Sequence, residues 1–351
     1  MTDAPHAPFD IAPLLGDVFD GKTLDQARAE EVMGALMDGR LSQMQAAALL
    51  AALRTRGETV DEIIGFARAM RARAVKVPVA VDGPLLDTCG TGGTGVDTFN
   101  ISTASLFVLA AGGVKVAKHG NRAVTRRSGA ADVLEALGAR LEASPARLAR
   151  SIETLGLAFI FARAHHPAMK FVAPIRADLK ARTIFNSLGP LTNPAGANRQ
   201  LLGVYDPKLT EPLALVLAGL GVERALVVYG DGIDELTVCG ETRVTELGPD
   251  GVTRTYTVHP SRVGLGYYEK PEIAGGSPEE NAVTIRAVLN GELHGAKRDV
   301  VLLNAGAALY LADEAPTIEA GVAKADEILE SGAAAEKLLE YVAFTRQPED
   351  L

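Results

Sequence analysis

Residues 1–75 alternate between apolar and polar positions with the spacing of amphipathic helices. Three capping-box patterns, each followed by apolar residues at helical spacing, begin at Thr23, Ser42 and Thr59. They predict helices over residues 24–38, 43–55 and 60–73. The middle helix is apolar over much of its surface, more than a solvent-facing helix needs. Burial against its neighbours explains this pattern, and a contribution to a subunit interface is the alternative.

The pattern changes at the proline-broken segment 75–84, after which short β-branched runs alternate with helical stretches, as is typical of an α/β sheet. The predicted strands cover residues 85–89, 114–117, 157–161 and 225–229, with an antiparallel hairpin over 243–258. The predicted helices cover residues 102–111, 130–138, 146–155, about 169–180, 210–220, a stretch capped by Ser277, and most of 300–342. Segment 75–84 is therefore the expected hinge between a helical domain, residues 1–75, and an α/β domain, residues 76–351.

Composition narrows the class of protein. Of the 351 residues, 47% are apolar and 23% charged, which is ordinary for a globular protein with an ample core. The net charge of −9 argues against general binding to nucleic acids or acidic membranes, so an anionic ligand needs a local basic patch or a metal. The N-terminus lacks the basic and apolar regions of a signal peptide, and no run approaches about 18 apolar residues. Cys89 and Cys239 form no metal or redox motif and are expected to be reduced cytoplasmic thiols.

Two candidate anion-binding loops lie close together between residues 87 and 132. The first, at residues 90–95, has four glycines in six positions and can turn several N–H groups toward phosphate oxygens. The run starting at Asn100 then opens an apolar helix, whose N-terminus also favours negative charge. The second loop, at residues 118–122, contains Lys118 and Arg122 and adds fixed positive charge. The pair predicts a ligand with two phosphorylated ends.

Two further positions are candidates for ligand contacts. Asp234 and Glu235 follow the predicted strand 225–229, where α/β proteins bind ligands, and carboxylates beside a diphosphate suit Mg²⁺. An acidic surface turn is the alternative. Arg176 lies among apolar residues and could pair with a carboxylate bidentately, or it could be a surface arginine in an ion pair.

Two other motifs carry little weight. The glycines at 90, 92 and 95 match the dinucleotide fingerprint, but the acidic residue expected about 20 positions later is replaced by a basic stretch. His165 and His166 suggest a metal pair, yet adjacent residues on a helix diverge and no third ligand is evident.

The motifs together resemble the anthranilate phosphoribosyltransferase family. They are GTGG with TFNIST, KHGNR, the block AHHPAM to VAPIR to RTIFN and LGPLTNP, the DEL sequence, and GGSPEENA. The resemblance runs from about residue 10 to 345. It implies transfer of the phosphoribosyl group of 5-phosphoribosyl 1-pyrophosphate to the amine of anthranilate, with Mg²⁺ and release of pyrophosphate, in tryptophan biosynthesis. It also implies an α/β domain with a central, mostly parallel sheet flanked by helices, and a segment near 170–195 that joins the helical domain. The active site would lie between the domains. The protein would be a cytoplasmic homodimer formed through the helical domain.

The resemblance also implies roles for individual residues. The phosphoribosyl pyrophosphate site would comprise Gly90, Thr91, Gly92, Gly93, Thr94, Thr98, Asn100, Ile101, Ser102, Thr103, Lys118, Gly120, Asn121, Arg122, Thr125, Arg126 and Ala130. Anthranilate would contact Gly90, His119, Asn121 and Arg176. Ser102 would also serve a magnesium ion, and Asp234 and Glu235 would form the second metal site. No residue is identified as a general acid or base.

The chain departs from the family pattern at several of these positions. Thr94 stands where the family usually has aspartate, so a carboxylate is lost. The nearby Asp97 could partly replace the charge of this carboxylate, but not its geometry. Thr125 and Arg126 stand where two small hydroxyl residues are usual, and Ala130 where serine is common. These differences could alter metal dependence or phosphoribosyl pyrophosphate affinity.

Two alternative functions remain at this point. A pyrimidine nucleoside phosphorylase shares the KHGNR motif, but the NIST segment, Arg176 and the Asp234–Glu235 pair suit a metal diphosphate and a carboxylated acceptor better. A homologue without catalysis that binds nucleic acid would be expected to have a basic surface, whereas this chain is acidic.

Overall fold

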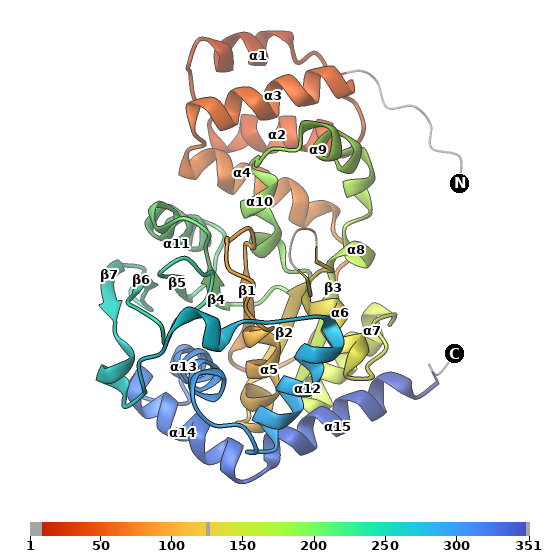
Figure 1. Cartoon of the computed structure of the whole chain (residues 1–351). Coiled ribbons are helices and arrows are strands. Elements are labelled where there is room, and N and C mark those ends of the chain that lie inside the picture. The colour runs from red at the N-terminus through yellow and green to blue at the C-terminus, as the bar shows by residue number, and fades with distance from the viewer. Residues whose placement is uncertain (1–8, 124–126, 349–351) are drawn as a thin grey trace.

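Four helices form the N-terminal part of the chain, at the top of Figure 1: α1 (Ala12–Phe19), α2 (Gln26–Met37), α3 (Gln43–Arg56) and α4 (Val60–Arg73). The computed structural model describes residues 9–123 and 127–348. The three predicted helices are confirmed, with capping boxes at Ser42 and Thr59. The predicted cap at Thr23 is wrong, because Asp25 accepts the hydrogen bond from the N–H of Arg28 at the start of α2. Helix α1 was not predicted.

A second segment returns to these helices from the middle of the chain. It consists of α8 (Ala162–His165), η1 (Pro167–Phe171), α9 (Ala173–Leu179), α10 (Phe185–Leu188) and η2 (Gly189–Thr192). The prediction of one helix over 169–180 is wrong, because a 3₁₀ turn ends at Phe171 and Pro174 stands in the first turn of a new helix. The Pro/Asn-rich turn expected next is instead largely helical. Val172, Ile175 and Leu191 are buried in one apolar cluster with residues of α2, α3 and α4.

A seven-stranded sheet forms the centre of the larger part, in the order β3-β2-β1-β4-β5-β6-β7. The strands are β1 (Leu85–Gly90), β2 (Lys115–Gly120), β3 (Leu157–Phe161), β4 (Arg199–Gly203), β5 (Arg224–Gly230), β6 (Thr242–Leu247) and β7 (Thr253–Val258). Strands β1 to β5 are parallel, and β6 and β7 complete the sheet as the predicted antiparallel hairpin. Every predicted strand is present, whereas β4 was not predicted.

Helices cover both faces of this sheet (Figure 1). They are α5 (Ile101–Ala111), α6 (Ala130–Ala136), α7 (Pro145–Leu155), α11 (Thr210–Gly219), α12 (Pro278–Leu289), α13 (Ala296–Leu311), α14 (Ile318–Glu330) and α15 (Ala333–Arg346), with short turns η3 (Pro207–Leu209), η4 (Pro260–Val263) and η5 (Lys270–Ile273). Alternate strand residues enter different cores. Leu201 and Leu226 pack with α5 and α13, whereas Leu202 and Val227 pack with α11 and the helical part.

The carboxyl ends of the five parallel strands meet at one edge of the sheet, which faces the helical part in Figure 1. The chain runs from β1 outward through β2 and β3, and then crosses to β4 on the other side of β1. Ligands of open α/β sheets bind at such a change of direction. Within the described ranges 9–123 and 127–348, no helix is long and apolar enough to cross a membrane.

Candidate functional site

The glycine-rich loop 90–95 leaves the end of β1 and is held by Asp234, which follows β5. The N–H of Gly92 donates a 2.7 Å hydrogen bond to Oδ2 of Asp234. The hydroxyl of Thr94 lies 3.5 Å from the other carboxylate oxygen. Gly92 and Gly93 have positive φ angles of 67° and 76°, which residues other than glycine rarely adopt. The loop therefore has the backbone freedom of an anion-binding nest, and an acidic side chain reaches it.

The loop after β5 reaches this position by crossing the end of β4. A Cβ atom on Gly203, the last residue of β4, would lie 1.7 Å from the carbonyl oxygen of Asp234. A Cβ atom on Gly90 would lie 2.2 Å from Oδ2 of the same aspartate. Both glycines are thus required for this close approach. Asp234 is buried, and Glu235 next to it is half-buried.

Helix α5 begins beside the glycine loop, at the predicted NIST segment. Asn100 is its N-cap but makes no side-chain capping bond to the helix. Its amide instead contacts Ser128 and Asn281. The hydroxyl of Thr103 in the first turn is buried and has no hydrogen-bond partner among the residues that the structure describes. In the first turn of α5, the N–H of Ile101 donates to the carbonyl oxygen of Phe99, and the N–H of Thr103 donates to that of Asn100.

Lys118, at the end of β2, is buried beneath these two loops. Its ammonium donates hydrogen bonds to the carbonyl oxygen of Thr88, at 2.6 Å, and to the hydroxyl of Ser102, at 3.0 Å. Burial lowers the pKa of Lys118, and the charges of Glu235 and Asp87 oppose that shift. An ammonium has three donors, so one remains beyond these two bonds. Lys118 thus lies between Ser102 and the acidic side chains at this edge of the sheet.

Asp87 is a further charged residue in this region, and it was not predicted. It is fully buried in β1, where burial raises its pKa to about 6 while bonds from Asn193 and the His119 N–H oppose the shift. The bond from His119 measures 3.1 Å. Asp87 therefore fixes the backbone of the KHGNR segment against β1. A carboxylate inside an otherwise apolar strand was the signal that could have identified it.

The second loop is organised by Asp132 of α6. One carboxylate oxygen accepts hydrogen bonds from the N–H groups of Ala123 and Gly129, and the other pairs with Arg122 at 2.9 Å. Arg122 also pairs with Glu135, so its charge is partly neutralised. Asn121 is exposed at the start of this loop. Thr125 and Arg126 lie outside the described residues, whereas Gly120 ends β2 and Ala130 begins α6.

Three histidines gather on the side of β3. The rings of His119 and His166 are 5.2 Å apart, and Nδ1 of His165 lies 2.7 Å from the carbonyl oxygen of Val75. Burial lowers the pKa of His119 to about 3 and that of His166 to about 4, and neighbouring histidine charges add to both shifts. Both ring nitrogens of His166 and Nε2 of His119 are buried without a partner in the described part of the chain. The imidazoles of His119 and His166 are therefore neutral at pH 7.

Arg176 lies on α9, which packs against α3 in the helical part. Its guanidinium lies 5.8 Å from the ring of Phe185, and burial lowers its pKa. Among residues 9–123 and 127–348, Arg176 has no ion-pair partner, so the alternative of a surface ion pair finds no support. A half-buried guanidinium without a carboxylate can accept one from a ligand.

Arg182, also missed by the sequence analysis, joins the helical part to the glycine loop. Its guanidinium donates to the carbonyl oxygen of Gly93 and stacks 4.3 Å from the ring of Tyr205. The remaining predicted positions lie close by in the chain: Thr91 follows β1, Thr98 pairs with Ala274, and Ile101 opens α5. The structure thus brings the glycine loop, Lys118, Ser102 and Asp234 into one region. It places Arg176 on a separate element above them.

Two domain models cover most of the chain. A model described as glycosyl transferase family, helical bundle domain, matches residues 12–74, and one described as glycosyl transferase family, a/b domain, matches residues 82–335.

Individual relatives are similar over nearly their whole length. An anthranilate phosphoribosyltransferase from Rubrobacter xylanophilus is 53% identical over 93% of this chain and 95% of its own. The crystal structure of an anthranilate phosphoribosyltransferase from Thermus thermophilus matches with a TM-score of 0.90 at 50% identity, covering 95% of this chain and 99% of the other. The enzyme of that name from Saccharomyces cerevisiae, in complex with PRPP and Mg, matches with a TM-score of 0.85 at 27% identity, covering 95% and 98% of the two chains.

Proposed function

The chain belongs to the anthranilate phosphoribosyltransferase family, and from this premise we propose how its site carries out the reaction. The enzyme transfers the phosphoribosyl group of 5-phosphoribosyl 1-pyrophosphate to the amine of anthranilate, in tryptophan biosynthesis. The products are N-(5-phosphoribosyl)anthranilate and pyrophosphate.

The observation that best supports this function is the contact between Asp234 and Gly92. It places an acidic pair beside a glycine loop and a helix start, which together suit a metal-bound diphosphate better than free phosphate. We assign the loop residues from Gly90 to Thr94, together with Thr98 and the start of α5 from Asn100 to Thr103, to the sugar diphosphate. Lys118, Gly120, Asn121, Arg122 and Ala130 border the same region, and Thr125 and Arg126 are assigned with them from sequence alone.

The residues present fit Mg²⁺. Magnesium takes few protein ligands and keeps several waters. The buried carboxylate of Asp234 and the half-buried Glu235 beside it supply the oxygen atoms that Mg²⁺ prefers. The hydroxyl of Ser102 would serve one magnesium ion, and Asp234 and Glu235 would form a second metal site. When bound, magnesium would neutralise charge on the leaving diphosphate.

The protein's own groups supply the rest of the chemistry. Loss of pyrophosphate leaves cationic character on the ribose and negative charge on the departing oxygens. The N–H groups of Thr91 and Gly92 donate to Gly203 and Asp234. We propose that other backbone N–H groups of loop 90–95 and of the start of α5 stabilise the developing charge, with little rearrangement because the fold holds them in place. Lys118 adds a buried positive charge and holds Ser102 in place. No general base is assigned, because anthranilate attacks as a neutral amine and positioning contributes much of the rate.

The acceptor site lies on the side of the helical part. We assign Arg176 to the carboxylate of anthranilate, with His119, Asn121 and Gly90 beside it. His119 is neutral, so it can donate a hydrogen bond without adding charge. Arg176 is on α9 and Gly90 is on β1, so a substrate that contacts both would bridge the two parts of the chain.

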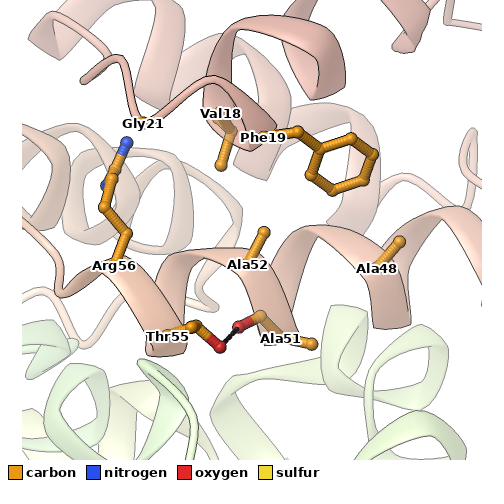
Figure 2. A pocket seen from close by; sticks show the side chains of 8 residues that line it. All are labelled: Val18, Phe19, Gly21, Ala48, Ala51, Ala52, Thr55 and Arg56. Atoms are coloured by element: carbon orange, nitrogen blue, oxygen red, sulfur yellow. Dashed lines mark hydrogen bonds between the residues drawn. The ribbon is translucent and has the colours of Figure 1, made fainter.

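A homodimer through the helical part is the expected assembly. A groove of about 510 Å³ lies between α1 and α3. Figure 2 shows the side chains that line it, among them Ala48, Ala51 and Ala52 of α3. Phe19 is 62% exposed at this groove, and Met44 on α3 is 83% exposed. Exposed apolar side chains next to a small-residue surface favour helix packing against a second copy. This supports an interface role for the groove face of α3, while Leu49, Leu50 and Leu53 of the same helix are buried in the core.

We further propose that the chain divides into a helical domain of residues 1–75 joined by about 170–195, and an α/β domain over 76–351, and that the enzyme is cytoplasmic. The buried cluster that includes Val172 and Leu191 supports the shared helical domain. The two unpaired cysteines agree with a reducing compartment.

The first test is the loss of anthranilate fluorescence on addition of phosphoribosyl pyrophosphate, with and without Mg²⁺. Magnesium-dependent loss is expected. No loss, together with phosphate-dependent cleavage of a pyrimidine nucleoside, would identify a phosphorylase. If the protein binds the substrates but catalyses neither reaction, it is a non-catalytic homologue.

A further inference from the structure

The GGSPEENA segment, at residues 275–282, packs against the chain just before α5. The N–H of Gly275 donates to the carbonyl oxygen of Asp97 at 2.9 Å, and the N–H of Phe99 donates to Ile273 at 3.3 Å. A Cβ atom on Gly275 would lie 2.6 Å from the backbone nitrogen of Phe99, so only glycine allows this approach. The segment thus forms a short ladder along residues 97–99, which lead from the glycine loop into α5.

Asn281 connects this ladder to Asn100. It lies in the first turn of α12 and is 2% exposed. Its carbonyl Oδ1 accepts a 2.8 Å hydrogen bond from the N–H of Gly276, and its Nδ2 donates a 3.0 Å hydrogen bond to Oδ1 of Asn100. The first bond fixes which way the Asn281 amide points, because only its oxygen can accept from Gly276. Asn281 therefore presents an N–H, and not a lone pair, to Asn100.

The amide of Asn100 is held by a second group as well. The hydroxyl of Ser128 donates to the same Oδ1 at 3.0 Å, and Nδ2 of Asn100 donates to the carbonyl oxygen of Ser128 at 3.4 Å. Oδ1 therefore has both lone pairs engaged, while Nδ2 has one N–H beyond its bond to Ser128. That N–H can serve an acceptor at the start of α5.

We propose that Asn281 is a positioning residue for the sugar diphosphate site: by donating to Oδ1 of Asn100, it orients the Asn100 amide so that its free N–H points to an anionic substrate. This rests on the proposed function, which places phosphoribosyl pyrophosphate at Asn100. The opposite orientation of the amide would turn an oxygen lone pair toward a phosphate or ribose oxygen, and two acceptors repel.

Asn281→Asp tests this with almost no change in shape. The aspartate can still accept from the N–H of Gly276. It can no longer donate to Asn100, nor to the carbonyl oxygen of Gly276, to which Nδ2 of Asn281 also donates at 3.4 Å. The KM for phosphoribosyl pyrophosphate should rise about tenfold, the factor that corresponds to about 1.4 kcal/mol. The KM for anthranilate and the melting temperature should match those of the control Asn290→Asp, an exposed asparagine at the other end of α12.

A double-mutant comparison separates positioning from a general structural effect. In an Asn100→Ala background, Asn281→Asp should change the diphosphate KM by less than about twofold, because the group through which it acts is gone. The proposal is wrong if the rise in the KM for phosphoribosyl pyrophosphate in the double mutant is the product of the rises in the two single mutants. The proposal is also wrong if Asn281→Asp and Asn290→Asp have the same KM for phosphoribosyl pyrophosphate.

Two further measurements keep the test decisive. If Asn281→Asp does not fold, Ser128→Ala removes the other donor to the same oxygen without touching residues 273–281, and it should raise the diphosphate KM in the same way. An unchanged KM would count against the proposal. If the wild-type protein does not consume anthranilate, the proposed function fails, yet calorimetric titration with magnesium pyrophosphate still decides whether Asn281 acts through Asn100.

Discussion

The carboxylate of Asp234 accepts a hydrogen bond of 2.7 Å from the backbone N–H of Gly92. The two residues lie at the ends of different strands, β5 and β1, and the contact crosses the end of β4. The same carboxylate is assigned to Mg²⁺, and the same N–H belongs to the loop assigned to the diphosphate. The proposed metal and diphosphate sites are therefore adjacent.

Asp234→Asn should weaken the binding of Mg²⁺ in the presence of pyrophosphate by about tenfold or more, because the amide loses the charge that a hard cation needs. Isothermal calorimetry measures this directly. The matched control is Asp231→Asn in the same loop, which is exposed and pairs with Lys270 at 2.9 Å. Equal magnesium affinities for both variants would remove Asp234 from the metal site.

Arg176→Ala should raise the KM for anthranilate about 10- to 100-fold, the range that loss of a charge-assisted hydrogen bond gives, and change the KM for phosphoribosyl pyrophosphate far less. Steady-state kinetics with each substrate varied in turn provides the comparison. Arg163→Ala, an exposed arginine on α8, should leave both constants unchanged. Similar increases in both KM values for Arg176→Ala would contradict the carboxylate contact.

The buried histidines make stability depend on pH. Burial lowers the pKa of His166 from 6.5 to about 4, so its neutral form is favoured in the folded state. Its contribution to stability is present above pH 6.5 and is lost as the pH falls toward 4, by up to about 3 kcal/mol. Denaturant unfolding of the wild type and of His166→Asn across this range should show a steeper loss in the wild type. Parallel curves would mean that His166 is not held neutral.

Glu62 should be important for the stability of the helical part. It is fully buried on α4, pairs with Arg56 at 2.5 Å and accepts hydrogen bonds of 2.9 Å from the N–H groups of Leu24 and Thr59. Glu62→Ala leaves the Arg56 charge and both N–H groups without a partner, which should destabilise the fold by about 3 kcal/mol. Chemical denaturation, with the exposed Glu31→Ala as the control, tests this. A difference below about 0.5 kcal/mol would show that water replaces the lost contacts.

Local sequence signals predicted most of the fold. Capping residues at Ser42, Thr59 and Ser277 identified helix starts, because a side-chain oxygen that bonds to the N3 N–H is a local interaction. Strand β4 was missed because it is short and begins with Arg199 and Gln200. Arg199 is buried there through its ion pairs with Glu223 and Asp313, which no local pattern reveals.

The glycine loop and the KHGNR segment were predicted as anion-binding loops because glycine and charge are visible in the sequence. Asp87, Arg182 and Asn281 were not predicted as part of the site. Asn281 bonds to a residue 181 positions away, and Arg182 reaches a carbonyl 89 positions away. The Asn281 contact forms only when α12 packs beside α5, and the Arg182 contact only when the helical part meets the sheet.

The split origin of the helical core affects how the protein is made. Its buried cluster combines α2, α3 and α4 with Val172, Phe185 and Leu191 from the middle of the chain. During translation, which proceeds from the N-terminus, the first four helices leave the ribosome long before these partners are synthesised. The four N-terminal helices therefore have an incomplete core at first. This core is completed only after strands β1, β2 and β3 have been synthesised.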